Sequence, residues 1–133
     1  MLPSAIDPPR AAVEEWEAAL ALNPNDGNAQ SNLAWVFATA PDASLRNGTR
    51  AVELAERALK LAGGINPILY RTLAAAYAES GRFDDAIATA ERGRAFAERE
   101  GNRELADEFV AVRDRYRQHQ PLRDARLELH EDL

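Results

Sequence analysis

The sequence predicts an all-α protein made of antiparallel helix pairs, and three of its features lead to this prediction. Alanine and leucine dominate the apolar residues while β-branched residues are few, which favours helix over strand. Apolar residues recur at helical spacing, and glycine and proline fall between the periodic segments. With 133 residues, 46% of them hydrophobic and 29% charged, the chain is long enough for one domain with its own core.

The first helix is predicted over residues 8–22. Asp7 is expected to cap it, and Pro8-Pro9 suits its first turn. The run from Asn23 to Asp26 ends it. Its apolar stripe consists of Ala12, Val13, Trp16, Ala19 and Leu20.

Two further helices are predicted over residues 28–40 and 49–62. The segment from Ala40 to Gly48 joins them and is rich in residue types that form turns. The apolar faces of these helices are marked by Leu33, Ala34, Phe37, Ala51, Ala55 and Ala58.

The next pair is predicted over residues 67–80 and 84–99. Asn66 is expected to cap the first of these helices, Gly81 to end it in the left-handed conformation, and Asp84 to cap the second. Small residues should lie where the two helices approach closely, with Tyr77 and Phe83 between them. The small residues are Ala74, Ala86, Ala90 and Gly93.

The last predicted helix covers residues 102–119 and is apolar on one side only, as the end of a helical array requires. Its apolar stripe is Leu105, Phe109, Val112 and Tyr116. Residues 120–133 form a tail whose short run from Arg126 to His130 fits a strand, while Leu122, Ala125 and Leu129 would share a helical face, so both conformations stay open.

The stretch from Asn66 to Gly93 resembles a tetratricopeptide repeat (TPR), whose signature is W-x2-L-G-x2-Y, then A-x3-F, then P. Here the two halves read Tyr70-x-x-Leu73-Ala74-x-x-Tyr77 and Ala86-x-x-x-Ala90-x-x-Gly93. The departures are Tyr70 for the Trp, Ala74 for the Gly, Ala90 for the aromatic residue and Glu98 for the Pro.

The rest of the chain keeps the register of this resemblance. Ala19 to Leu33 spans 14 residues, as tandem repeats of 34 residues require. Leu33 to Leu73 spans 40, and the six extra residues fall in two connections, mostly in Pro41–Gly48. This Pro-Asp-x-x-x-Arg-Asn-Gly insertion is similar to that of a subset of bacterial TPR proteins.

The resemblance implies a right-handed superhelix that occupies residues 1–119 and precedes the tail. Its parts would be a half repeat at 8–26, full repeats at 27–65 and 66–99, and a capping helix at 102–119. It also implies a concave groove that holds a peptide or a partner helix. The groove would be lined by Asn28, Ser31, Asn32, Trp35, Thr39, Ile68, Arg71, Thr72, Ala75 and Glu79. Ser31 and Trp35 stand where the carboxylate-clamping Lys and Asn of some TPR domains would be, so that clamp is missing.

Catalytic, metal and cofactor sites are not expected. The sequence has no cysteine, its only histidines are His119 and His130, and it contains no phosphate-binding loop or nucleophile motif. The net charge of −6 argues against nucleic acid as a partner. No signal peptide or membrane-spanning stretch is visible, which favours a cytoplasmic, non-membrane protein.

The expected function is therefore that of an interaction scaffold or adaptor, not of an enzyme. Two alternatives are that the chain is the C-terminal TPR segment of a larger bacterial protein, or that it binds a small molecule or lipid. Apolar residues of the first helix, around Trp16, and the leucines of the tail have no assigned partner. Either the tail folds back onto its own helices, or these ends support weak self-association.

Overall fold

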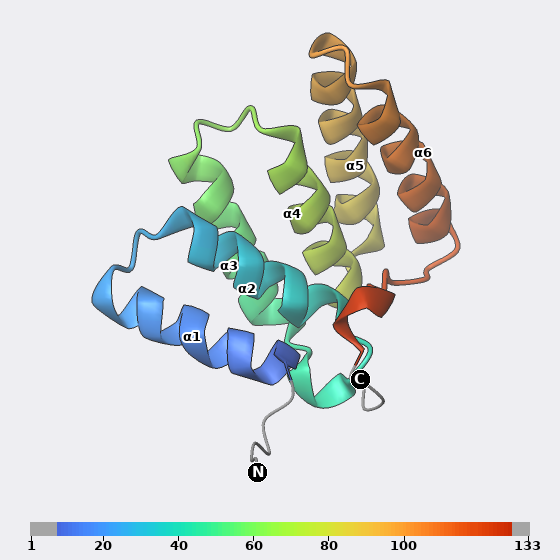
Figure 1. The fold of residues 1–133 in the computed structure, drawn as a ribbon. Coiled ribbons are helices and arrows are strands. Elements are labelled where there is room, and N and C mark those ends of the chain that lie inside the picture. Colours follow the sequence, from blue (N-terminus) through green and yellow to red (C-terminus); the bar gives the residue numbers. More distant parts are fainter. Residues whose placement is uncertain (1–7, 129–133) are drawn as a thin grey trace.

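The structure is a computed structural model that describes residues 8–128, and within them it contains six α-helices and two short 3-10 turns (Figure 1). In chain order these are α1 (Pro8–Leu22), α2 (Gly27–Thr39), η1 (Ala43–Leu45), α3 (Gly48–Leu61), α4 (Pro67–Glu79), α5 (Phe83–Arg99), α6 (Arg103–Arg117) and η2 (Ala125–Leu127). No strand occurs between residues 8 and 128, so the all-α prediction is confirmed.

The predicted helix boundaries agree with the observed ones to within one residue, apart from the end of α6. That helix ends at Arg117, and His119 then takes a left-handed conformation with a φ of 57°. Asp7, the predicted cap of α1, and residues 129–133 of the tail lie outside the described residues.

Each helix packs against the next one, and α2 also packs against α4 (Figure 1). The second and fourth helices therefore lie side by side. The chain after α6 turns back and brings η2 beside the end of α2, which is far from it in the sequence (Figure 1). These two helices, α2 and α4, contain the ten residues that were predicted to line the groove.

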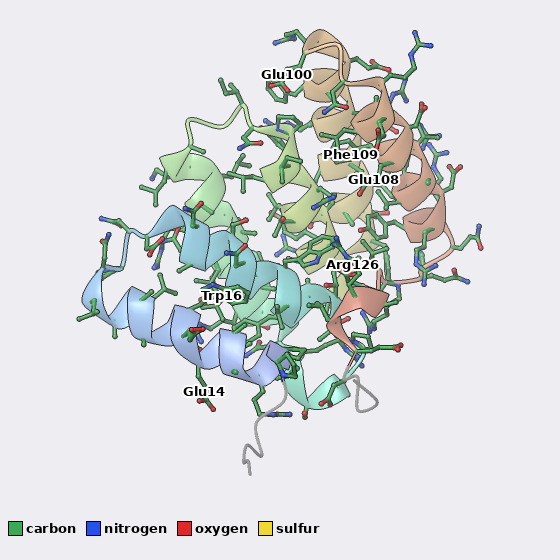
Figure 2. The ribbon with its side chains drawn as sticks, in the orientation of Figure 1. Glu14, Trp16, Glu100, Glu108, Phe109 and Arg126 are labelled. Carbon is green, nitrogen blue, oxygen red and sulfur yellow. The ribbon has the colours of Figure 1, made fainter. Side chains whose placement is uncertain are left out.

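Small side chains make these helix contacts close. Ala34, Ala38 and Ala51 are completely buried in the cluster around α2 and α3. The residues predicted at the contact between α4 and α5 are buried too, which confirms that prediction: Ala74, Ala86, Ala90 and Gly93. Phe109 of α6 lies in the interior beside them, whereas Glu14 and Glu100 point outward (Figure 2).

Local capping explains where most helices begin. Asn47, Asn66 and Asn102 each accept a hydrogen bond from a backbone N–H in the first turn of the helix that follows. The predicted cap at Asp84 is wrong, because α5 already begins at Phe83 and Asp84 lies inside its first turn. There its negative charge still favours the positive end of the helix dipole.

Gly93 has less room for a Cβ than the other glycines, and we predict that Gly93→Ala destabilises the fold by about 1–3 kcal/mol through overpacking. A Cβ at this position would collide with the Phe109 ring and lie 2.8 Å from Cβ of Tyr70. Chemical denaturation measures the loss.

Gly27→Ala is the matched control, because a Cβ there meets nothing within 4 Å. The control should keep its stability to within about 0.5 kcal/mol. Equal stability of the two variants would contradict the close approach of α4, α5 and α6.

Candidate protein-interaction surface

The predicted groove residues lie along α2 and α4 and divide into three groups. Thr39, Thr72 and Ala75 are buried and offer no accessible side chain. Four residues lie near the start of the two helices and border an open hollow: Asn28, Ser31, Asn32 and Ile68. Trp35, Arg71 and Glu79 lie further along the helices, where the returning tail contacts Trp35 and Glu79 and α6 contacts Arg71.

The open hollow has a volume of about 570 Å³ and combines apolar and amide side chains. Leu61 and Ile68 are 51% and 43% exposed and provide its apolar part. Asn28, Asn32 and Asn66 line it as well. Amide side chains both donate and accept hydrogen bonds, which suits contact with a peptide backbone.

The covered part is built around the C-terminal end of α2. The last carbonyl groups of a helix have no partner within the helix, and here Ala38, Thr39 and Ala40 are completely buried. Loop backbone satisfies the first two carbonyls: Ala40 N–H donates to Val36 O at 3.0 Å and Asn47 N–H to Phe37 O at 2.9 Å. The tail supplies the donors for the next two.

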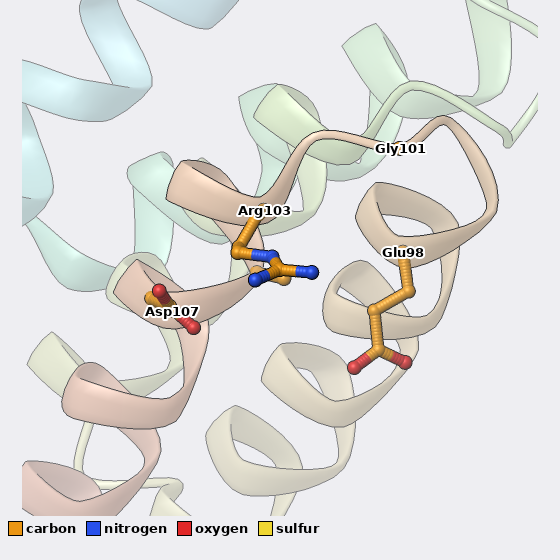
Figure 3. Close-up of a pocket in the computed structure, with 5 residues that line it drawn as sticks. Glu98, Gly101, Arg103 and Asp107 are labelled. Carbon is orange, nitrogen blue, oxygen red and sulfur yellow. The ribbon is translucent and has the colours of Figure 1, made fainter.

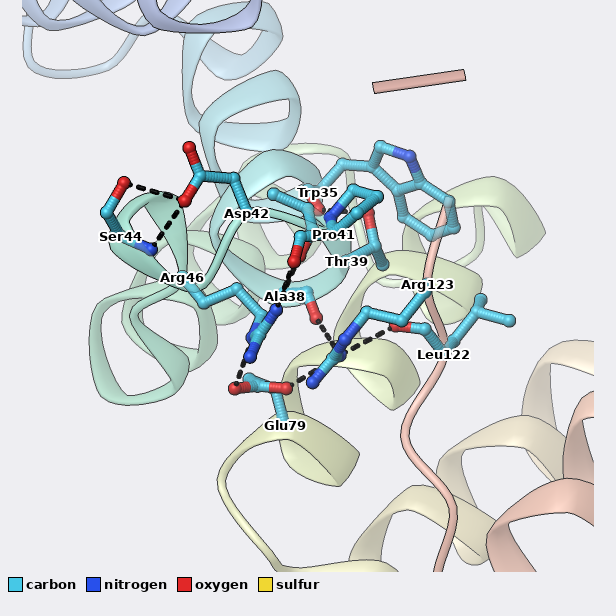
Figure 4. Close-up of polar contacts among 11 residues, drawn as sticks. Trp35, Ala38, Thr39, Pro41, Asp42, Ser44, Arg46, Glu79, Leu122 and Arg123 are labelled. Atoms are coloured by element: carbon cyan, nitrogen blue, oxygen red, sulfur yellow. Dashed lines mark hydrogen bonds and ion pairs between the residues drawn. The ribbon is translucent and has the colours of Figure 1, made fainter. Parts of the chain in front are cut away.

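In the tail, Asp124 N–H donates to Thr39 O at 2.9 Å, and the Arg123 guanidinium reaches Ala38 O at 3.4 Å. Arg123 also pairs with Glu79 of α4 at 2.8 Å (Figure 4). A second guanidinium, that of Arg46, lies 3.2 Å from the same carboxylate. Glu79 therefore ties the tail and the loop before α3 to one point on α4.

Trp35 of α2 also contacts the tail, at the residue after Arg123. Its indole N–H donates to the Asp124 carboxylate at 2.8 Å, and the Arg71 guanidinium stacks over its ring at 4.8 Å. Arg71 in turn pairs with Glu108 of α6 at 3.0 Å. Trp35 thus contacts both Asp124 of the tail and Arg71 of α4, and Arg71 continues the connection to Glu108 of α6.

Two leucines anchor the tail on either side of these polar contacts. Leu122 packs against two large core clusters, one around α2 and α3 and one around α4, α5 and α6. Leu127 packs against a smaller cluster of Val36, Ala40 and Leu45, as Val13 and Trp16 also do. Arg115 of α6 donates to Pro121 O at 2.8 Å. Residues 121–127 therefore run from α6 across α4 and α2 to the cluster against which α1 also packs.

This path decides between the two alternatives for the described part of the tail, which folds back onto its own helices. It is neither a strand nor a regular helix, but an extended segment with a 3-10 turn. Self-association stays a prediction, although Trp16 and Leu127 already pack against the same core cluster within one chain.

Electrostatics stabilise the ionised form of Asp124. Hydrogen bonds from the Arg126 guanidinium lower its pKa most, partial burial opposes them, and the Trp35 indole N–H lowers the pKa further, to about 2. The Asp124 side chain is only 9% exposed, while the Arg126 side chain is 80% exposed. The tail therefore presents a charged group to Trp35 and not a neutral acid.

Another hollow, of about 560 Å³, lies at the turn between α5 and α6. Glu98, Arg103 and Asp107 line it with opposite charges from both helices (Figure 3). Within residues 8–128 no group of three or more His, Cys, Asp or Glu side chains could hold a metal ion. None of the helices described has the length and apolar character needed to cross a membrane.

Sequence reasoning missed the tail residues that contact Glu79 and Trp35, which are Arg123 and Asp124, and it missed Glu108, the partner of Arg71. The only signal for the tail was its unassigned leucines, Leu122 and Leu127 among them. Glu108 is exposed as a residue and still pairs with Arg71.

Comparisons with protein-family models, with curated proteins and with solved structures give no match for this chain.

The pKa of Asp124 leads to a prediction about pH. The ordinary pKa of Asp is 3.8 and that of Asp124 is about 2. Arg126, in the tail itself, causes the largest part of this lowering, and the Trp35 indole N–H causes a part that requires docking, so ionisation favours docking. This contribution is fully present above pH 4 and is lost as the pH falls through about 2. The Trp35 indole N–H resonance, followed by NMR, should stay constant from pH 7 to about 4 and move below it.

Asp124→Asn is the control and should remove the pH-dependent change of that resonance. Helicity is followed in parallel, so that loss of the fold is recognised separately. A midpoint near pH 4 in the wild-type chain would show that the carboxylate does not contact the indole.

Proposed function

We propose that this chain is a protein-interaction scaffold or adaptor that holds an extended peptide or a partner helix on the face of α2 and α4. One observation carries this proposal: an extended segment, the chain's own tail, already lies on that face and is held there by backbone and side-chain contacts. We propose binding, not catalysis, as its role.

The TPR resemblance supports the same proposal. The predicted helix pairs occur where the repeats place them, and the small residues of the motif, Ala74 and Ala86, are buried between helices. In this proposal α2 with α3 and α4 with α5 are two TPR units in a right-handed superhelix, α1 is a half repeat and α6 the cap. The insertion from Pro41 to Gly48 supplies Arg46, which binds Glu79 beside the groove.

The open hollow provides the part of the face that is accessible while the tail is docked. Its exposed Leu61 and Ile68 can bury apolar side chains of a partner, and its asparagines can bind the partner's backbone. A partner should therefore enter at the start of α2 and α4 and run toward Trp35.

Selection of a random peptide library against the full chain tests this proposal. Selected peptides should bind with micromolar Kd, and Ile68→Asp should weaken them about 10-fold or more. Asp at this position keeps α4 intact, because it follows the cap Asn66 and Pro67 and lies at the positive end of the helix.

Leu22→Asp is the matched control, since Leu22 is 89% exposed but does not line the hollow. Binding of the selected peptides should be unchanged in this variant. Peptides that are insensitive to Ile68→Asp, or a selection that yields none, would contradict a peptide site on this face.

A further inference from the structure

Two backbone acceptors at the end of α2 depend on the tail. Thr39 O accepts from Asp124 N–H and Ala38 O from Arg123, and both acceptor residues are completely buried. If the tail leaves, these carbonyl groups need other donors, because buried backbone groups are rarely left unpaired. The surface therefore requires a segment that offers a backbone N–H and a cation next to each other.

The side-chain contacts add further requirements in a fixed order. An apolar residue occupies the site of Leu122, a cation that of Arg123 beside Glu79, and an anion that of Asp124 beside Trp35. A second apolar residue follows three positions later, at Leu127. The pattern presented to the surface reads Leu-Arg-Asp-x-x-Leu.

The tail is held less firmly than the helices it crosses. None of residues 121–128 is buried, whereas α2 and α4 each contain several residues with 3% exposure or less. Its polar contacts include ion pairs that remain partly exposed, such as that of Arg123, whose side chain is 30% exposed. Segments with few buried contacts open most readily, and partly exposed ion pairs add little to their stability.

On the basis of the interaction function proposed above, we infer that the surface under residues 121–128 recognises partner segments of the pattern Leu-Arg-Asp-x-x-Leu, and that the tail competes for it in the same chain. The partner is an extended protein segment, since it must offer a backbone N–H to Thr39 O. Binding of such a partner displaces the tail and extends the contact toward the open hollow.

The experiment uses the full chain and a labelled synthetic peptide of residues 120–128. A charge exchange in the tail, Arg123→Glu with Asp124→Lys, places an acid beside Glu79 and a cation beside the Trp35 indole N–H, which should undock the tail. Both substitutions lie outside the six helices. Fluorescence anisotropy measures peptide binding to this variant and to the wild-type chain. Circular dichroism checks that both keep their helicity.

The size of the expected effect follows from the tethering of the tail. A short flexible tether gives an effective concentration on the order of 1 mM, so for an intrinsic Kd of about 50 µM the docked tail weakens peptide binding about 20-fold. The variant should therefore bind the peptide about 20-fold more tightly than the wild type. Adding Trp35→Phe to the variant should weaken it again, because the indole N–H is lost while the ring remains.

A peptide with the same charge exchange is the control and should not bind the variant. Equal peptide affinity for wild type and variant, or equal binding of both peptides, would overturn the inference. If the variant binds library peptides through Ile68 but not the tail peptide, the inference is wrong and the proposed function stands. If it binds neither, both are wrong.

Discussion

The buried C-terminal end of α2 is the constraint on which the arrangement of this protein depends. Carbonyl groups at a helix end need donors from elsewhere, and water cannot reach them where Ala38, Thr39 and Ala40 are completely buried. The chain supplies donors from two distant places, the loop before α3 and the tail after α6. Glu79 of α4 binds the guanidinium of each, through Arg46 and Arg123 (Figure 4).

Most of the fold could be predicted because its determinants are local. Asn66 with Pro67 begins α4, Gly81 ends it with a φ of 79°, and apolar spacing selects the buried face of α6. Asp84 was assigned as a cap because its residue type fits one, but the turn after Gly81 brings α5 to its start one residue earlier, at Phe83. Capping by residue type alone does not fix the position at which a turn closes.

The candidate surface was predictable only in part, for a physical reason. Trp35, Arg71 and Glu79 lie on helix faces, so helical periodicity places them together. The contacts that dock Arg123 and Asp124 are with backbone carbonyls and side chains more than forty positions away, and no periodicity encodes such pairs. The docking of the tail beside Trp35 and Glu79 can therefore be recognised only from the three-dimensional structure, in which the carbonyl groups at the end of α2 need donors.

Amide hydrogen exchange at Asp124 tests the docking of the tail most directly, because this N–H donates to Thr39 O at 2.9 Å. In the full chain its exchange should be at least about 10-fold slower than in a free peptide of the same sequence, which corresponds to an opening free energy above about 1.4 kcal/mol. The charge exchange at Arg123 and Asp124 should abolish this protection. Exchange at the free-peptide rate in the wild-type chain would contradict a docked tail.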